Sequence, residues 1–169
     1  MKNTSDIKNM YQSDRIKTVQ DSKTEQVYVV HPQHINPQGR LFGVCLMQWI
    51  DVMGGIVSRR HSGKMVTTAM VDSMNFKAGA FQNDMVVLTG KLTFVGHTSM
   101  EVRVDTYIED CQGKRKNINT AFLVMVALDA NGNLAVVPGI QIETEEDQEE
   151  WLRGQKRYLL RKTRRIEGY

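Results

Sequence analysis

One segment in the first half of the chain is apolar on more than one side of a helix. Its apolar residues recur at the spacing of helical turns; they are Phe42, Leu46, Trp49, Ile50, Met53, Ile56 and Val57. Because these residues cover more than one helical face, the segment predicts a helix that is buried on most sides. A sheet that curls around the helix provides such an environment, so the segment favours a mixed layer of helix and sheet.

Segments of β character stand on both sides of this helix. Before it, residues 24–30 are β-rich and stop at His31-Pro32, where proline cannot donate to a strand ladder. After it come four β-rich segments separated by polar turns: 65–76, 84–95, 98–109 and 117–128. Polar and apolar residues alternate from Ser99 to Asp110, which predicts one buried and one solvent-facing side. We therefore expect an α+β fold, with a curled, mostly antiparallel sheet around one long central helix.

The length of 169 residues fits one domain with distinct segments at its two ends. Residues 1–23 are polar without sustained periodicity and are expected to form a flexible lead-in or a frayed helix, followed by the folded domain over 24–140. Residues 141–169 are expected to form a charged C-terminal helix capped by Thr144, because acids precede bases as a helix dipole favours. Its narrow apolar stripe would consist of Trp151, Leu152, Tyr158 and Leu159. Such a helix is expected to rest on its own domain or on a neighbouring subunit.

Composition restricts the partners and the compartment. The net charge of +3 is mild and does not demand nucleic acid as a partner. Cys45 and Cys111 form no disulfide framework, which fits a reducing compartment. The first residues lack the apolar run of a signal peptide or membrane span. We expect a cytoplasmic protein that binds neither nucleic acid nor membrane.

Three residues around the start of the central helix are candidates for chemistry. Asp51 is a carboxylate among apolar neighbours, so it either activates water as a general base or pairs with Arg59, Arg60 or a backbone amide. Asn36 either orients a carbonyl group or closes an Asx turn. Gly43 stands at the expected helix N-terminus, where free N–H groups can stabilise an oxyanion, unless glycine serves only close packing.

The spacing of Gly43 and Asp51 restricts how they can act together. Eight residues separate them along one helix, which places their backbones roughly 12 Å apart. Two groups at that separation cannot both act on one reacting carbon. If both act, they come from two chains, and this requires at least a symmetric dimer with two composite sites.

Other polar residues carry weaker signals. Residues 96–99 join two expected strands and either form a plain hairpin turn or contact a ligand's phosphate or pantetheine. His31 and His34 lack a second ligand cluster, so no metal site is expected. Cys45 has no neighbouring base and is expected to be a small buried hydrophobe rather than a nucleophile.

Four motifs follow one another between roughly Val27 and Pro138. They read Asn36-Pro-Gln-Gly39-Arg-Leu-Phe-Gly43, Trp49-Ile-Asp51, Thr68-Ala-Met-Val-Asp72-Ser-Met-Asn-Phe76 and Val95-Gly-His-Thr-Ser-Met-Glu101. In order and spacing they resemble the acyl-CoA thioesterase family with the hotdog fold. The resemblance implies hydrolysis of acyl-CoA to free fatty acid and CoA, with coenzyme A as part of substrate and product and no other cofactor or metal. It also implies a homo-oligomer, at least a dimer and often a trimer of dimers.

The resemblance assigns roles to the matching positions. Asp51 would be the base that activates water, with Thr68 as a supporting hydroxyl. Asn36 would hold the thioester or the water, and the backbone N–H of Gly43 would donate to the carbonyl oxygen. The CoA-binding positions would be Gly96, His97, Thr98 and Ser99.

Two departures from the family pattern affect these roles. Val44 follows Gly43 where the family usually has a second glycine, which narrows the approach to the helix terminus. His97 stands where the family often has arginine, and histidine is a weaker, pH-dependent partner for a phosphate.

Two other functions remain open from the sequence. A hotdog hydratase or dehydratase acting on acyl thioesters would use His34 and Asp51 as its pair. The second alternative is a sensor that binds CoA thioesters without turnover, like hotdog regulators fused to a DNA-binding helix-turn-helix. The segment before Thr24 is too short and too poorly patterned for such a module.

Overall fold

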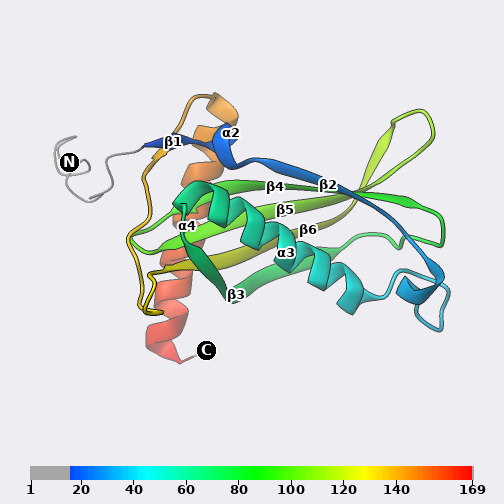
Figure 1. Cartoon of the computed structure of the whole chain (residues 1–169), viewed down its shortest axis with the longest axis horizontal. Helices are drawn as coiled ribbons and strands as arrows, with labels where there is room; N and C mark the ends of the chain where they lie inside the picture. The colour runs from blue at the N-terminus through cyan, green and yellow to red at the C-terminus, as the bar shows by residue number, and fades with distance from the viewer. Residues whose placement is uncertain (1–15, 169) are drawn as a thin grey trace.

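The computed structural model describes residues 16–168. Its elements, in chain order, are β1 (Lys17–Thr18), α2 (Val19–Ser22), β2 (Thr24–Val29), the short 3-10 helix η1 (Pro32–His34), α3 (Gly43–Ser62), β3 (Met65–Phe76), β4 (Met85–Val95), β5 (Ser99–Glu109), β6 (Arg115–Leu128), β7 (Ile140–Gln141) and α4 (Glu145–Glu167). Figure 1 shows α3 on the near side of the sheet and α4 on the far side. The sheet therefore separates two helices that cover opposite faces.

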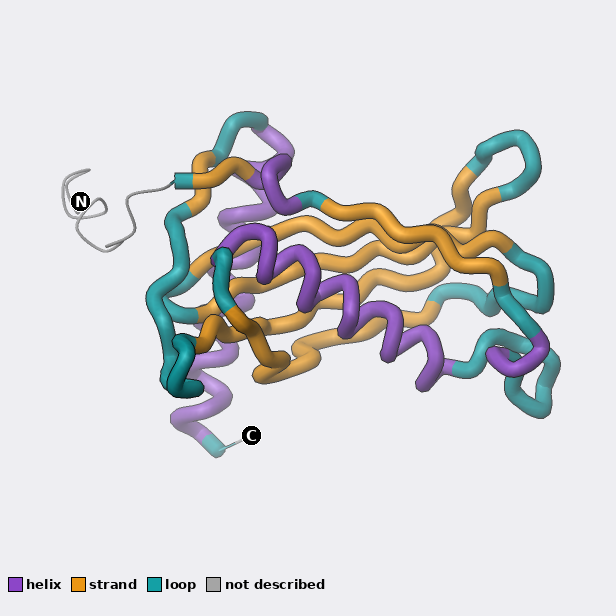
Figure 2. The backbone as a smooth tube through the Cα atoms, in the orientation of Figure 1, coloured by secondary structure: helices purple, strands orange, loops and turns teal. Residues whose placement is uncertain are grey.

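Five strands form one antiparallel sheet in the order β2-β4-β5-β6-β3. The edge strands β2 and β3 flank α3, so the helix carries the chain from one edge of the sheet to the other (Figure 1). Figure 2 shows α3 running along one face of the sheet, with the turn into β3 at the end of the helix. The expected α+β architecture, with a curled antiparallel sheet, one long central helix and a C-terminal helix, is confirmed.

One side of α3 packs tightly on the sheet. Its buried apolar residues are Leu46, Trp49, Ile50, Met53 and Val57. The helix lies so close to β4 that a Cβ on Gly90 would stand 2.7 Å from Cγ of Met53. The opposite side is open in the single chain, where Val44 is 62 % and Val52 is 45 % exposed. The expectation that α3 is buried on most sides is wrong for the isolated chain, because the sheet covers only one face.

Regular structure begins before the predicted start at residue 24. Thr18 caps α2: its Oγ1 accepts from Asp21 N–H at 3.2 Å, while its own N–H donates to Asp21 Oδ2 at 2.8 Å. Val19 is buried, and β1 pairs in parallel with β7. This corrects the lead-in expected over 1–23, since residues 17–22 are built into the domain. The rest of that prediction, residues 1–15, lies outside the described residues.

The outer face of β5 is covered, which contradicts the solvent-facing side that its alternation predicted. Glu101 on that face is 1 % exposed. Its Oε1 accepts from Thr93 Oγ1 at 2.6 Å and from Arg157 of α4 at 2.8 Å. Its Oε2 accepts from Arg161 of α4 at 2.5 Å. The strand does alternate between polar and apolar residues. Its polar side is buried because α4 covers it and supplies basic partners.

The C-terminal helix begins at its predicted cap but uses only part of its predicted stripe. Thr144 Oγ1 accepts from Asp147 N–H at 3.1 Å. Trp151 and Tyr158 pack on Phe94, with ring centroids 4.6 Å and 5.1 Å away. The other two members of the expected stripe, Leu152 and Leu159, are exposed. The predicted stripe is therefore correct for Trp151 and Tyr158 and wrong for the two leucines. The polar network around Glu101 fixes which side of α4 faces the sheet.

Candidate active site

Asp51 lies on the open side of α3, facing the edge strand β3. The hydroxyl of Thr68 donates to Asp51 Oδ1 at 2.5 Å and also lies 3.5 Å from Sδ of Met125. The alternative partners do not pair with Asp51: among the described residues, neither Arg59 nor Arg60 forms an ion pair, and Arg60 donates to Thr24 Oγ1. The geometry therefore presents a carboxylate that a single hydroxyl orients.

Asn36 and Gly43 meet at the N-terminal end of α3, in a pocket of about 420 Å³. Gly43 is the first residue of α3, and Phe42 before it makes no side-chain cap. Among the residues that the structure describes, the first N–H groups of the helix therefore lack helical and side-chain acceptors, and they carry the positive end of the helix dipole. These groups can stabilise negative charge that develops on a bound carbonyl oxygen.

The side chain of Asn36 closes a turn and still lines this pocket. Its Oδ1 accepts from the backbone N–H of Gln38 at 3.0 Å and of Arg40 at 3.1 Å. The Asx-turn interpretation is thus correct for the oxygen. The amide Nδ2, which donates to no acceptor within residues 16–168, is the part of the side chain that can bind a ligand.

The structure does not bring the four predicted catalytic residues together within one chain. The pocket that contains Asn36 and Gly43 is lined neither by Asp51 nor by Thr68. Phe76, at the far end of β3, closes this pocket, with Cζ 3.8 Å from a Cβ built on Gly43. One chain therefore holds two separate half-sites on the open side of α3, one at its N-terminal end and one near its middle.

Residues 96–99 form the tight connection between β4 and β5. The Gly96 N–H donates to the carbonyl oxygen of Ser99 at 2.8 Å, and a Cβ on Gly96 would stand 2.9 Å from Ser99 Oγ. Val126 of β6 pairs with Ser99 on one side and with Thr67 on the other. The loop is thus two strand spacings, roughly 10 Å, from the Thr67–Thr68 segment of the same chain.

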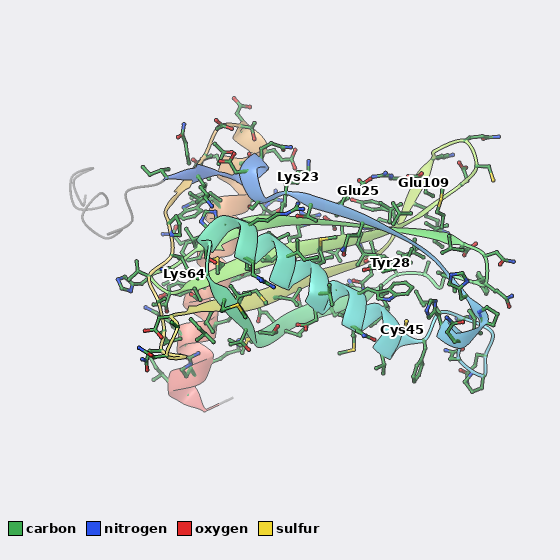
Figure 3. The ribbon with its side chains drawn as sticks, viewed as in Figure 1. Lys23, Glu25, Tyr28, Cys45, Lys64 and Glu109 are labelled. Carbon is green, nitrogen blue, oxygen red and sulfur yellow. The ribbon has the colours of Figure 1, made fainter. Side chains whose placement is uncertain are left out.

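The histidines and the first cysteine have structural surroundings. His34 Nδ1 accepts from the His31 N–H at 3.1 Å, and the His34 ring lies edge-on to Trp49. Cys45, labelled in Figure 3, lies half-buried in the first turn of α3, and burial raises the pKa of its thiol. A raised pKa reduces the fraction of reactive thiolate, as expected for a residue that is not a nucleophile.

Residues 16–168 contain neither a metal-binding cluster nor a membrane-spanning helix. No group of three His, Cys, Asp or Glu in this part of the chain is arranged to hold a metal ion. None of its helices is long and apolar enough to cross a membrane.

Two cations near the Asn36 pocket were not assigned a role from the sequence. Arg40 and Lys77 both line the pocket. Arg40 passes over Gly79, where a Cβ would meet its Cδ at 3.1 Å. Lys77 Nζ donates to Asn117 Oδ1 at 2.5 Å. Arg40 could have been found from the sequence, because it stands inside the first motif. Lys77 could not, because only the pairing of β3 with β6 brings it to the pocket.

Comparison with known proteins places this geometry in a family. Residues 38–113 match the Thioesterase superfamily. The uncharacterized acyl-CoA thioester hydrolase YkhA of Bacillus subtilis is 39 % identical over 128 residues, covering 75 % of this chain and 74 % of that protein. The cytosolic acyl coenzyme A thioester hydrolase of Homo sapiens is 31 % identical over 152 residues, or 88 % of this chain, which spans 40 % of that protein's length.

Solved structures agree with these relatives. The acyl-CoA hydrolase of Staphylococcus aureus, determined with butyryl coenzyme A, coenzyme A and coenzyme A disulfide, superposes with a TM-score of 0.86 at 32 % identity over 91 % of this chain and 94 % of that one. An apo-hexameric acyl-CoA thioesterase superposes with a TM-score of 0.85 at 33 % identity over 89 % and 97 % of the two chains. The fold is therefore a hotdog fold. The chain belongs to the acyl-CoA thioesterases of the Thioesterase superfamily, as the sequence motifs implied.

Proposed function

We propose that this protein hydrolyses acyl-CoA to a free fatty acid and CoA at a site shared by two chains. The observation that carries the proposal is the division of the site within one chain. The Asp51–Thr68 pair stands near the middle of α3 on its open side, and the pocket with Asn36 and Gly43 stands at the N-terminal end of the helix. Each half holds what the other lacks, a base for water in one and donors for a carbonyl oxygen in the other.

Residue spacing in a related enzyme supports the assignment of these positions. Structures of the Staphylococcus aureus hydrolase carry single alanine replacements of an asparagine, an aspartate and a threonine. In that protein's numbering the asparagine precedes the aspartate by 15 residues, and the threonine follows the aspartate by 17. The same separations relate Asn36, Asp51 and Thr68 in this chain.

The surface around the two half-sites supports a dimer. Within residues 16–168 the edge strand β3 pairs only with β6, and its residues Met70 and Val71 are exposed. The neighbouring open side of α3 exposes Val44, Met47 and Val52. A long apolar edge strand of this kind is a template for pairing with a second chain. A two-fold axis beside α3 would bring the Asn36 half of one chain to the Asp51 half of the other.

The half-sites together account for each step of thioester hydrolysis. Asp51 takes a proton from a water as the water oxygen bonds to the thioester carbon. The negative charge on the carbonyl oxygen is stabilised by the Gly43 N–H and the positive end of α3, while Asn36 Nδ2 holds the thioester or the water. The carbon–sulfur bond then breaks, and the proton held by Asp51 passes to the departing CoA sulfur. The products are a fatty acid and CoA, and the proposed reaction uses no metal or redox cofactor.

The assembly and location proposed here follow from the same comparisons. A trimer of dimers is supported by the hexameric thioesterase that superposes on this chain. A cytoplasmic location is supported by the human relative, which is described as cytosolic. The catalytic unit is proposed to end near residue 140, with the helix of residues 141–169 attached to it.

A hydratase or dehydratase is less well supported by the surroundings of His34. Its Nδ1 is occupied by the His31 N–H, and its ring packs on Trp49, which stands on the buried side of α3. The pair that this function requires, His34 with Asp51, would have to use His34 Nε2, since Nδ1 is engaged.

The proposed function is tested by measuring free thiol released from a series of acyl-CoAs of increasing chain length. We expect turnover by the wild type and a loss of roughly 100-fold or more in kcat for Asp51→Ala, the scale of general-base catalysis. Glu149→Ala, an exposed carboxylate on α4, serves as the matched control and should leave turnover unchanged. Binding of acyl-CoA without thiol release would instead indicate a sensor, and undiminished turnover by Asp51→Ala would refute the role of Asp51.

A further inference from the structure

The basic end of α4 lies beside the loop of residues 96–99. A Cβ built on Gly96 would stand 3.8 Å from Cε2 of Tyr158, whose ring also packs on Phe94 near the end of β4. The ammonium group of Lys162 lies 4.8 Å from the centroid of the Tyr158 ring. One turn of α4 therefore places an aromatic ring, and a cation resting on that ring, next to the connection between β4 and β5.

Most arginines around this turn are already neutralised, but Lys162 is not. Arg161 bridges the buried carboxylates of Asp72 and Glu101, and Arg164 also pairs with Asp72. Among residues 16–168, Lys162 and Arg165 form no ion pair. Arg165 follows Tyr158 by seven residues, or two helical turns, so it projects from the same side of α4. This side carries positive charge that the protein does not balance locally.

The loop itself offers hydrogen-bond donors without a charge. The carbonyl oxygens of His97 and Thr98 accept from Val137 and Ala127, both at 3.0 Å, and these bonds hold the loop in place. Within residues 16–168, the N–H groups of His97 and Thr98 donate to no acceptor. Neighbouring free N–H groups bind anions such as phosphate. The loop has no lysine or arginine of its own, so a permanent charge must come from another element.

We propose that Lys162 binds the phosphate groups at the nucleotide end of coenzyme A, together with the N–H groups of His97 and Thr98. Tyr158 acts as a positioning residue, because its ring holds the Lys162 ammonium beside the loop. The inference rests on the proposed function and assigns a further part of the same substrate. It is consistent with the loop's position two strands from Thr67, since an extended pantetheine arm spans the distance from the loop to the Asp51 half-site.

The direct test measures binding of free CoA by isothermal titration calorimetry at low salt. For Lys162→Ala we expect Kd to rise roughly 3- to 10-fold, the size of one exposed charge-assisted contact. The difference should shrink at high salt, and Lys162→Arg should restore binding. Lys156→Ala is the matched control, because it removes the same charge from an exposed position on another side of α4. An equal Kd for the Lys156 and Lys162 variants would overturn the proposal.

A kinetic comparison separates phosphate binding from a structural effect. We expect Lys162→Ala to raise KM for acyl-CoA with unchanged kcat, and to leave KM unchanged for the matching acyl-pantetheine, which lacks the nucleotide phosphates. Equal losses on both substrates would overturn the proposal. Tyr158→Leu should weaken CoA binding as Lys162→Ala does, whereas Tyr158→Phe keeps the ring and should retain it.

The two proposals can fail separately. Calorimetry with CoA does not require turnover, so a wild type that binds CoA in a Lys162-dependent manner but releases no thiol would refute hydrolysis and support the phosphate site. A wild type that hydrolyses acyl-CoA but binds CoA equally well with and without Lys162 would refute the phosphate site alone.

Discussion

The hydroxyl of Thr68 orients the carboxylate of Asp51 across the narrow space between β3 and α3. The two elements are joined by a short turn in which Gly63, at φ 65°, takes the left-handed conformation that ends α3 and reverses the chain. Because the contact depends on a local reversal, both of its members belong to the same chain. The base is therefore oriented by its own chain, whereas the donors that it works with are proposed to come from the partner.

Thr68→Val should lower kcat about 10-fold while leaving KM nearly unchanged, because it removes the donor that orients Asp51 but no group proposed to bind substrate. Steady-state thiol release measures both constants. Thr68→Ser keeps the hydroxyl and is expected to retain most of the activity. Equal kcat values for the valine and serine variants would contradict the proposed role of the hydroxyl.

Gly43→Pro tests the backbone donor without adding a polar group. Proline is favoured at the first position of a helix, and Phe42 before it is already extended, at φ −67° and ψ 127°. The variant should fold, yet it lacks the N–H proposed to face the carbonyl oxygen, so kcat should fall roughly 100-fold or more. Gly43→Ala keeps the N–H and serves as the control. If the alanine variant lost as much kcat as the proline variant, crowding rather than the missing donor would explain the loss.

A shared site predicts complementation between two inactive chains. When Asn36→Ala and Asp51→Ala chains are co-expressed, a mixed dimer contains one site with both changes and one site with neither. Random pairing should then restore about a quarter of the wild-type activity. Thiol release per milligram of the purified mixture measures it.

The control for this experiment pairs two changes in the same half-site, Asn36→Ala with Gly43→Pro. Each site of their mixed dimer carries one defect, so no activity should return. Failure of the Asn36→Ala and Asp51→Ala mixture to regain activity, in a preparation where mass spectrometry shows mixed dimers, would exclude the shared site.

Gly154 allows α4 to pack directly on β4. A Cβ there would stand 2.8 Å from Cβ of Phe94 and 3.0 Å from the carbonyl oxygen of Thr93, and neither atom can move without shifting the strand. Gly154→Ala should therefore lower the free energy of unfolding by about 1–3 kcal/mol, as measured by urea denaturation. Exposed Gln155→Ala is the matched control. Stabilisation of the Gly154 variant by about 1 kcal/mol, which helix propensity alone favours, would show that α4 is not docked so closely.

Periodicity made the central helix and the strands predictable, because their apolar patterns depend on residues close in the chain. The burial of Glu101 was not predictable, because the arginines that cover it arrive with α4, more than fifty positions later. The meeting of Thr68 with Asp51 came from family resemblance and not from spacing, since register shifts in β3 on both sides of Met70 and Val71 disturb its alternation. Local sequence pattern thus predicts the helices and strands. It does not predict the surroundings of the polar residues, because these depend on contacts between elements distant in the chain.

A buried histidine near the C-terminal end of α3 couples stability to pH. His61 is fully buried and its Nε2 donates to the carbonyl oxygen of Pro138 at 2.9 Å, while Nδ1 has no partner among the described residues. Burial lowers the pKa of the imidazole from its ordinary value of 6.5, and the bond to Pro138 only partly opposes this shift. The folded chain therefore holds His61 neutral at a pH where the unfolded chain has already bound a proton.

Because the unfolded state binds more protons, the contribution of neutral His61 to stability is complete above pH 6.5 and is lost as the pH falls through the lowered pKa. We expect the free energy of unfolding, from urea denaturation at pH 7 and pH 5, to fall more for the wild type than for His61→Gln. Glutamine can still donate to Pro138 but does not titrate in this range. His97→Gln, which removes an exposed histidine, is the matched control. If His61→Gln lost as much stability between pH 7 and pH 5 as the wild type, carboxylates elsewhere would account for the whole acid dependence.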